Sequence, residues 1–267
     1  LFYKGILDDS DSKNIAIVGT RKATEMGKKR VDTLLHELAE TGYHPNIISG
    51  LAYGIDITAH TACMHYGLKA QAVLGHGLHM VYPASHKSMA EKILEQGGAL
   101  ISEFPTCAQI LPTNFLQRNR IVAGMSEAIL VAESPIKGGA MSTARQALSY
   151  NRDVMAIPGR PEDPTFAGCN LLIKQNIAAL VENIKDLIRI LNWPPLPTGP
   201  YQMSLDLFPV TNNEVLLMET LLKRGEQNID QLHQLTRIPV HDLSVLLLKL
   251  ELEGHVMQLP GNCYTLI

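Results

Sequence analysis

A threonine, an arginine and a lysine follow a glycine near the start of the chain: Thr20, Arg21 and Lys22. The residues before Gly19 are apolar, a pattern typical of a strand that is buried on both faces and followed by a turn. Ligands of parallel α/β sheets bind at the carboxyl ends of the strands, where a hydroxyl and two cations suit an anion such as phosphate. The segment is not a dinucleotide-binding fingerprint, because the next glycine lies too far along the chain.

Cationic, hydroxyl and glycine residues also follow other apolar stretches of the chain. Those that could contact an anion are Ser49, Gly50, Arg118, Arg120, Lys137, Gly138, Gly139 and Ser142. Hydroxyl groups and glycine amides can donate hydrogen bonds to phosphate oxygens, and Arg and Lys supply charge. Any one of these residues alone is better explained as solvated surface. Gathered at one sheet edge, the set predicts a phosphate or nucleic-acid site.

Two of these arginines flank Asn119 in a stretch with helical character. Adjacent residues of a helix point about 100° apart, so Arg118 and Arg120 cannot both lie flat against one ligand. We expect one of them to contact the ligand and the other to brace the fold against Glu103 or Glu133. The sequence leaves open which arginine does which.

The sequence offers little that would support catalysis or a metal site. Asp56 and His60 lie four residues apart and could form the acid–base pair of a hydrolase, but a hydrogen bond that fixes a helix start is the simpler interpretation. No Ser or Cys stands in a nucleophile elbow, and His76 and His79 lack a third metal ligand. The cysteines are far apart and are interpreted as free thiols: Cys63, Cys107, Cys169 and Cys263. We therefore predict no catalytic residue, no metal and no cofactor.

The elements that would position the anion ligands alternate along the chain. Strands are expected at residues 14–18, 46–48, 70–74, 99–102, 127–132 and 154–157, with helical periodicity between most of them. Leu1–Tyr3 are expected to pack on the sheet as a lead-in. This alternation predicts a doubly wound parallel sheet, whose right-handed crossovers bring all strand-to-helix loops to one edge.

The last quarter of the chain has a different pattern. Residues 193–212 contain five prolines and no periodicity, and are predicted to be a linker. Residues 213–267 read as three helices and a hairpin, which together make a winged helix. Four cations and seven carboxylates between residues 211 and 267 give a net charge of −3, which would repel duplex DNA. A protein-contact or packing role is the better interpretation of this module.

The composition places few further limits on function. The chain has 267 residues, 46% of them hydrophobic, and a net charge of −3, so only a local basic site could bind nucleic acid. No apolar stretch is long enough to span a bilayer, and no signal peptide is recognised before the first strand. We therefore expect a cytoplasmic protein without a membrane partner.

Several short motifs together resemble one known family. They are Ile17-Val18-Gly19-Thr20-Arg21 with Thr24 and Gly27, Ser49-Gly50-Leu51-Ala52 with Gly54-Ile55-Asp56 and Ala59-His60, Gly75 and Gly77 with Tyr82-Pro83, Ser102-Glu103 with Pro105, Arg118-Asn119-Arg120, and Pro158-Gly159. The chain resembles the DNA-processing protein A family (DprA/Smf) over residues 1–180, and its tail resembles that family's optional winged helix.

The resemblance implies an extended Rossmann-like domain at residues 1–192 that binds single-stranded DNA and forms a homodimer. It also implies a non-catalytic protein that protects incoming DNA and helps load the recombinase RecA during natural transformation.

Carried over by position, the family's DNA-binding residues are Thr20, Arg21, Lys22, Ser49, Gly50, Arg118, Asn119, Arg120, Lys137, Gly138 and Gly139. Three stretches depart from the family's common pattern: Lys137–Gly139, Gly168–Asn170 and Asn176–Ile177. The resemblance therefore does not define the pocket wall or any dimer contact near residues 166–180.

Two alternative functions use the same predicted pocket. Residues 137–145 faintly resemble the phosphate loop of the lysine-decarboxylase-like phosphoribohydrolases, but Arg145 stands near the position of their catalytic Glu. A mononucleotide sensor that uses the same pocket is the other alternative. For the single-strand binder we expect little sequence preference, because aromatic residues are few and Phe115 is only a weak candidate for a base contact.

Overall fold

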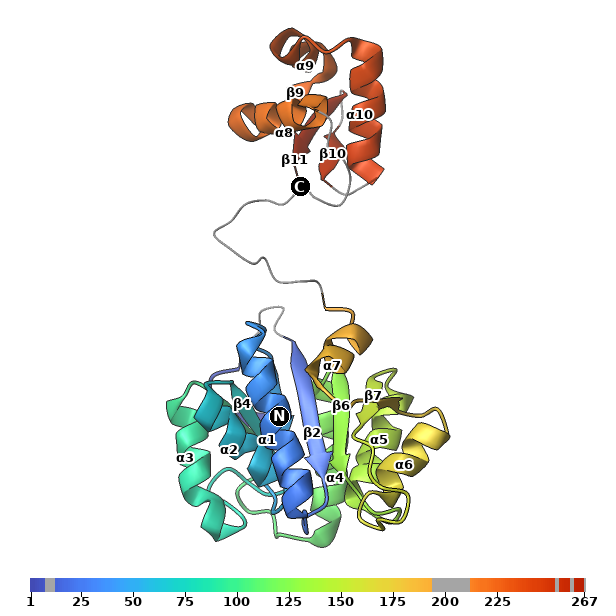
Figure 1. The fold of residues 1–267 in the computed structure, drawn as a ribbon. Coiled ribbons are helices and arrows are strands. Elements are labelled where there is room, and N and C mark those ends of the chain that lie inside the picture. Colours follow the sequence, from blue (N-terminus) through green and yellow to red (C-terminus); the bar gives the residue numbers. More distant parts are fainter. Residues whose placement is uncertain (8–12, 194–211, 253–254, 260–261, 267) are drawn as a thin grey trace. The chain divides into compact units, whose positions relative to one another are not determined.

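The computed structural model describes residues 1–7, 13–193, 212–252, 255–259 and 262–266. The chain divides into two compact units, residues 1–196 and 197–267 (Figure 1). The linker predicted at residues 193–212 lies outside the described residues except at its two ends.

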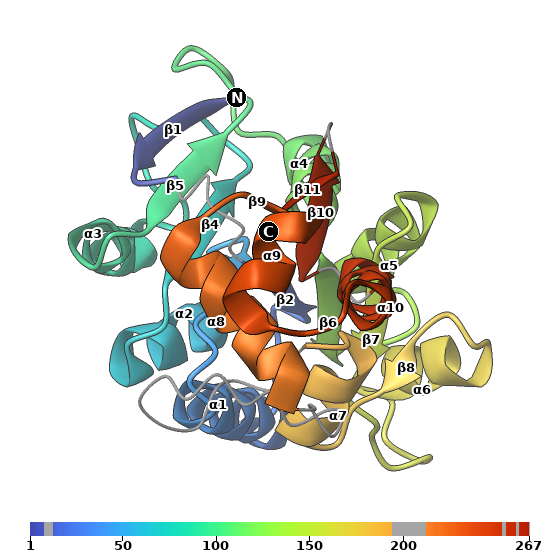
Figure 2. The same cartoon turned by 90° about the horizontal axis from the view of Figure 1, so that it is seen from above.

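The first unit is built on one eight-stranded sheet with the order β1-β5-β4-β3-β2-β6-β7-β8. Figure 2 shows β1 and β8 at its opposite edges. The strands are β1 Phe2–Gly5, β2 Asn14–Gly19, β3 Asn46–Ser49, β4 Ala70–Leu74, β5 Ala99–Ser102, β6 Ala128–Glu133, β7 Asp153–Ala156 and β8 Ala179–Leu180. All neighbouring pairs are parallel except β1 with β5. The chain winds outward from β2 to β5 and then returns to β6, so the topological switch lies between β2 and β6.

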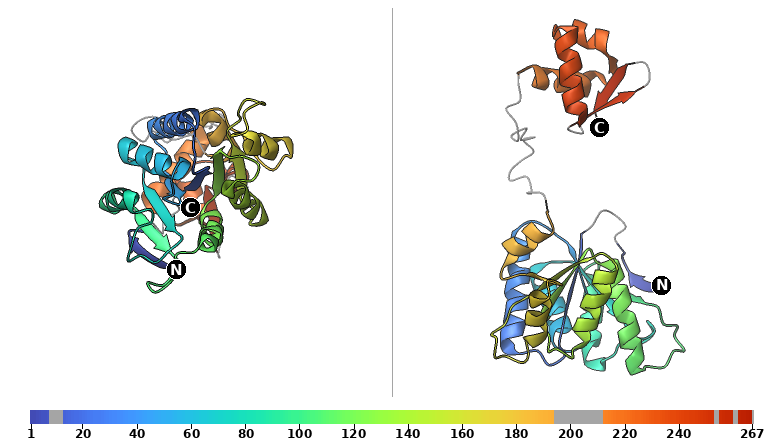
Figure 3. Two further views of the ribbon diagram at one scale, coloured as in Figure 1. Left: turned by 90° about the horizontal axis from the view of Figure 1, so that it is seen from below. Right: turned by 90° about the vertical axis from the view of Figure 1, so that its right-hand side faces the viewer.

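The central strands are apolar on both faces because helices cover both. Along β2, Ile15 and Ile17 belong to one buried cluster, and Ala16 and Val18 belong to the other. The first cluster is covered by α1 Glu25–Glu40, α2 Ile55–Tyr66, α3 Lys87–Glu95 and α7 Ile184–Ile190. The second is covered by α4 Pro112–Met125, α5 Gly139–Ser149 and α6 Ala167–Lys174 (Figure 3). The predicted doubly wound sheet is therefore confirmed.

The N-terminal lead-in differs from the prediction. It forms β1, whose Cα partners pair Phe2 with Ser102 and Gly5 with Ala99 at the edge of the sheet. Its side chains do not pack into the core, since Leu1 is 74% exposed and Tyr3 is 58% exposed. Main-chain hydrogen bonding to β5 places this segment, which an apolar pattern alone does not reveal.

The second unit has the predicted three helices and hairpin. Its elements are α8 Asn212–Arg224, β9 Gln227–Asn228, α9 Ile229–Thr236, α10 Val240–Leu252, β10 Val256–Leu259 and β11 Cys263–Leu266. The strands form a small sheet in the order β10-β11-β9, and Leu217, Leu232 and Leu247 contribute to the core. Among the residues that the structure describes, none of the helices of either unit combines the length and apolar character of a bilayer-spanning segment.

A buried carboxylate anchors the loop between β2 and α1. Glu133, at the end of β6, is fully buried, and its oxygens accept hydrogen bonds from the Thr24 amide at 3.0 and 3.1 Å and from the Thr24 hydroxyl at 3.0 Å. Thr24 in turn caps α1, because its Oγ1 accepts a bond from the Gly27 amide. The Glu133 carbonyl also accepts a bond from the Thr20 amide at 2.7 Å. One residue of β6 therefore fixes both ends of the loop that carries Arg21.

Glu133→Gln tests this anchor. The new amide would turn an NH₂ group toward the Thr24 N–H and leave a buried donor unsatisfied, so we expect the free energy of unfolding to fall by about 1–3 kcal/mol. Denaturant unfolding measures this change. Glu25→Gln is the matched control, because the Glu25 side chain is 90% exposed, and its effect should stay within about 0.5 kcal/mol. Equal stability of the two variants would contradict the anchoring role.

Candidate nucleic-acid interface

A pocket of about 240 Å³ lies at the carboxyl ends of β2 and β3, beside the topological switch of the sheet. Its lining comes from the β2 and β3 loops and from the helices α2, α4 and α5: Val18, Gly19, Thr20, Arg21, Gly50, Ala52, Asp56, Phe115, Leu116, Arg118, Asn119, Val122, Gly138, Gly139, Ala140 and Thr143. Four predicted segments that are far apart in sequence therefore meet in one pocket, as the doubly wound topology requires.

Of the two arginines that line this pocket among the described residues, Arg21 is the one that no internal hydrogen bond or ion pair engages. Its side chain is exposed, and its guanidinium carbon lies 5.0 Å from the centroid of the Phe115 ring. Lys22 beside it is also exposed, and its amide donates to the Thr20 hydroxyl at 3.2 Å. Within the described part of the chain, no ion pair engages either residue. Both charges are therefore free to meet an anion.

Arg118 lines the same pocket but is engaged inside the protein. It is 5% exposed, and its Nη1 donates to the Gly50 carbonyl oxygen at 2.9 Å and to the Val73 carbonyl oxygen. Its Nε donates to Asn119 Oδ1 at 3.2 Å. Burial lowers the pKa of the guanidinium, the charge of Asp56 opposes this and that of Arg21 adds to it. Arg118 thus ties α4 to the ends of β3 and β4.

Glycine at position 50 lets the Arg118 guanidinium lie against the main chain. A Cβ on residue 50 would overlap the guanidinium of Arg118. The amide of Gly50 donates to Asp56 Oδ2 at 3.1 Å, so it faces the protein rather than the pocket opening. Gly50 therefore contributes to the site by letting Arg118 approach the main chain.

The predicted hydrogen bond between Asp56 and His60 is wrong. Asp56 accepts from the Gly50 amide and lies in the field of Arg118; burial, the largest effect, still raises its pKa. Neither ring nitrogen of His60 has a hydrogen-bond partner among the residues that the structure describes. Residues four apart share a helix face, but the carboxylate turns to the cation and the main-chain donor that the fold brings close. Burial, followed by the charges of Arg118 and His86, lowers the pKa of His60 to about 3.

The other predicted ligands fall outside the pocket or face away from it. Arg120 forms an ion pair with Glu103, so the bracing arginine of the prediction is Arg120, although Arg118 is structural as well. Ser49 is fully buried, and its hydroxyl donates to the Ile17 carbonyl oxygen at 2.7 Å, which links β3 to β2. Lys137 is exposed at the loop before α5. Neither Lys137 nor Ser142 lines the pocket.

The N-terminus of α5 opens into the pocket. From the sequence alone, the only main-chain amides expected to face an anion here are those of Gly138 and Gly139. The N-cap residue of α5 is Gly138, which has no side chain that could cap the first amides of the helix. The first helical residues, Gly139 and Ala140, line the pocket together with Thr143. Free amides and the helix dipole at such an end attract anions. Thr143 stands one turn after Gly139, and this spacing is the signal that could have identified it.

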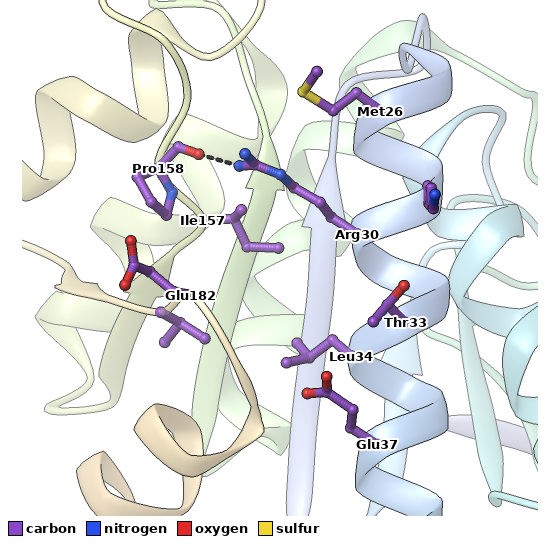
Figure 4. Close-up of a pocket in the computed structure, with 10 residues that line it drawn as sticks. Met26, Arg30, Thr33, Leu34, Glu37, Ile157, Pro158 and Glu182 are labelled. Carbon is purple, nitrogen blue, oxygen red and sulfur yellow. Dashed lines mark hydrogen bonds between the residues drawn. The ribbon is translucent and has the colours of Figure 1, made fainter.

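A larger cavity of about 400 Å³ lies between α1 and the segments after β7 and β8 (Figure 4). Arg30 lines it together with Lys29. Arg30 donates to the Pro158 carbonyl oxygen, and its guanidinium carbon lies 5.5 Å from the Phe166 ring centroid. Glu37 accepts from the Ile184 amide. None of the predicted anion ligands lines it. The described residues contain no group of three His, Cys, Asp or Glu placed to hold a metal ion, and the four cysteines are free.

Comparison with known proteins agrees with this geometry. A family model described as DNA recombination-mediator protein A matches residues 1–192. The chain belongs to this family. A second model, the DprA winged helix domain, matches residues 217–262 and so assigns the second unit of this DprA-family chain. The resemblance inferred from the motifs is confirmed.

Among its relatives, the chain is 36% identical to Protein Smf of Escherichia coli, over 98% of this chain and 70% of that protein. The crystal structure of DprA from Streptococcus pneumoniae aligns with a TM-score of 0.65 and 36% identity, covering 70% of this chain and 65% of that one. DprA from Helicobacter pylori, whose structure is described as showing a single-stranded DNA binding mode, aligns with a TM-score of 0.60 and 30% identity, over 67% of this chain and 80% of that one.

The buried His60 predicts a pH dependence of stability. Its ordinary pKa is 6.5 and its pKa in the folded protein is about 3, so between these values the unfolded chain binds a proton that the folded chain does not. Stability from this residue is complete above pH 6.5 and is lost as the pH falls, by about 2 kcal/mol at pH 5. Urea unfolding over a pH series should show a flatter dependence for His60→Leu.

His44→Leu is the matched control, since His44 is exposed. Its pH dependence should follow that of the parent. A His60→Leu protein whose stability falls with acid as steeply as that of the parent would show that other groups cause the loss.

Proposed function

We propose that the pocket at the switch of the sheet binds the phosphate backbone of single-stranded DNA. The observation that carries this proposal is the exposed guanidinium of Arg21, which has no carboxylate partner among the described residues and stands beside the open N-terminus of α5. Charged donors and helix amides are the groups that position nucleic-acid backbones. The related H. pylori protein, described as binding single-stranded DNA, supports the choice of ligand.

The proposed ligand contacts divide into direct and supporting groups. Direct contacts come from residues that face the pocket or its rim: Thr20, Arg21, Lys22, Asn119, Gly138, Gly139 and Thr143. Lys137 and Ser142 lie beyond the lining and would meet the strand only as it leaves the pocket. Ser49, Gly50, Arg118 and Arg120 hold the loops in place through the internal bonds described above.

Single strands suit this site better than duplexes. A pocket of about 240 Å³ has room for a phosphate and part of a nucleotide but not for a double helix. In the second unit, Lys249 of α10 pairs with the buried Glu214 at 2.9 Å, and Val245 and Leu248 of the same helix are 67% and 59% exposed. An apolar helix face of this kind lacks the cations that a major-groove helix presents to phosphates.

A non-catalytic role fits the carboxyl groups near the site. Among the described residues that line the pocket, the carboxylate is that of Asp56, which is bound to the Gly50 amide and buried beside Arg118. Arg145, near the position of the catalytic Glu in nucleotide phosphoribohydrolases, is exposed and does not line the pocket. Incubation with nucleoside monophosphates should therefore release no free base in a chromatographic assay.

The wider role follows from membership of the family. We infer that the chain protects incoming DNA and helps load the recombinase RecA on it during natural transformation, as a homodimer of the Rossmann-like domain. The family description as a recombination mediator supports this inference. We assign residues 1–192 to the DNA-binding domain and 213–267 to the winged helix, joined by a linker at 193–212. A light-scattering mass of two chains and faster RecA filament growth on single strands are the expected results.

Arg21→Ala tests the binding site directly. Removal of a charge-assisted hydrogen bond to phosphate costs about 1.5–3 kcal/mol, so affinity for a single-stranded oligonucleotide should fall roughly 10- to 150-fold. The salt dependence should become shallower by about 0.7 in the log–log slope for each phosphate that the variant no longer neutralises. Fluorescence anisotropy across a salt series, with single- and double-stranded oligonucleotides, measures both effects.

Arg189→Ala is the matched control. Arg189 is 77% exposed on α7 and pairs with Asp186. The start of α7 contacts Glu37 of α1, and no α7 residue lines the pocket. Removal of the Arg189 side chain should leave both affinity and slope unchanged. An Arg21→Ala protein that binds single strands with the parent's affinity and slope would refute the proposed site.

A further inference from the structure

The exposed aromatic surface near Arg21 belongs to two tyrosines rather than to Phe115. Tyr53, in the loop after β3, is 51% exposed, and Tyr82, in the loop after β4, is 47% exposed. Phe115 is only half-buried, but the Arg21 guanidinium lies over its ring, and its ring edge packs against Gly75. A base that approaches this edge of the sheet therefore finds more open ring surface on the tyrosines.

Tyr82 is held beside the pocket. Its ring centroid lies 5.9 Å from that of Phe115, with the two planes tilted by 43°. Its amide donates to Nε2 of the buried His76 at 3.0 Å. The ring therefore continues the aromatic surface that starts under Arg21.

Tyr53 is fixed in the loop after β3, against residues of the β4 loop. Its ring packs edge-on against His86 with centroids 4.8 Å apart, and its hydroxyl lies 3.2 Å from that of Ser85. His86 is in turn 2.8 Å from the Leu51 carbonyl oxygen through Nδ1. A Cβ on the adjacent Gly54 would lie only 2.7 Å from the carbonyl carbon of Arg21, so this loop sits directly against the Arg21 backbone. Both rings are held before any ligand arrives, which reduces the entropic cost of stacking.

The charges of the neighbouring loops favour a DNA strand that passes over the β3 and β4 loops. The segment from Gly75 to Ser88 contains no Asp or Glu, and it carries the exposed Lys87. The loop after β7, on the other side of the pocket, carries Glu162 and Asp163 together with Arg160. Phosphates that leave the pocket over the β4 loop would therefore meet an exposed cation and no carboxylate of this segment.

We propose that Tyr53 and Tyr82 form a base-stacking station for single-stranded DNA beyond the phosphate pocket, so that the strand leaves the pocket over the β3 and β4 loops. The inference rests on the proposed function, because it concerns the same ligand. Every base has a π face, so the station takes unpaired bases of any sequence. Arg21 then contributes salt-dependent affinity, and the tyrosines contribute affinity that does not depend on salt.

Base removal separates stacking from phosphate binding. The probes are oligothymidylate and an oligonucleotide of the same length whose central positions are abasic, which keeps the phosphates and removes the rings. Tyr53→Leu and Tyr82→Leu should each weaken binding to the intact probe about 10-fold, as the loss of one stacked base predicts. Neither should change binding to the abasic probe or the salt slope. Tyr53→Phe and Tyr82→Phe keep the ring and should bind like the parent.

Tyr150→Leu is the matched control, because Tyr150 is 45% exposed but follows the C-terminal end of α5. Circular dichroism checks the fold of each variant. Equal losses of affinity for the intact and abasic probes would mean that the tyrosines support the loops rather than stack on bases. No loss on either probe would mean that they do not contact the strand. Either result overturns the inference, while a weakened Arg21→Ala protein still supports the proposed function. A parent protein that binds neither probe overturns both.

Discussion

The hydrogen bonds of the Arg118 guanidinium set the geometry of the carboxyl edge. A buried cation is tolerated only where hydrogen bonds and an opposite charge replace its water, and Arg118 finds these in the carbonyls of Gly50 and Val73 and in the field of Asp56. These bonds join α4 to the carboxyl ends of two neighbouring strands, β3 and β4. They also keep one positive charge behind the pocket, where it adds to the potential around Arg21 without being exposed itself.

Glu133 plays the complementary part on the other side of the switch. Its carboxylate and carbonyl bind the loop after β2 at Thr20 and Thr24, so the main chain on either side of Arg21 is held to β6. The exposed Arg21 side chain thus stands on a loop that is fixed at both ends. A buried anion and a buried cation, each satisfied within the protein, place a third and unsatisfied charge where a ligand can reach it.

The sequence predicted the frame of this site better than its details. Apolar stretches that end at loops with glycines or cations gave the six main strands, and the crossover rule then brought residues 20, 50, 118 and 138 together. The sequence could not show which of these side chains point into the protein. Arg118 and Arg120 point to different sides of α4, and the sequence does not show which side faces the sheet. In the structure Arg118 contacts Val73 and Arg120 contacts Glu103. Ser49 was misjudged as a ligand because the end of a buried strand and the start of a loop look alike in sequence.

Other misses have the same physical origin. The pairing of Asp56 with His60 was inferred from spacing along one helix, whereas the carboxylate responds to a cation 62 positions further along the chain. The strand β1 carries exposed side chains and is held by its main chain, which no residue pattern records. Local periodicity therefore identified the six main strands and most of the helices between them. Long-range electrostatics and main-chain bonding decided the roles of the polar side chains.

The close approach of Arg118 to Gly50 has a consequence for how this edge can vary. A methyl group at position 50 would collide with the guanidinium, but it would meet much less resistance if position 118 carried a short side chain. The effects of the two substitutions are therefore not additive, and one should partly mask the other in a double-mutant cycle. Such epistasis means that the two positions are expected to change together rather than one at a time.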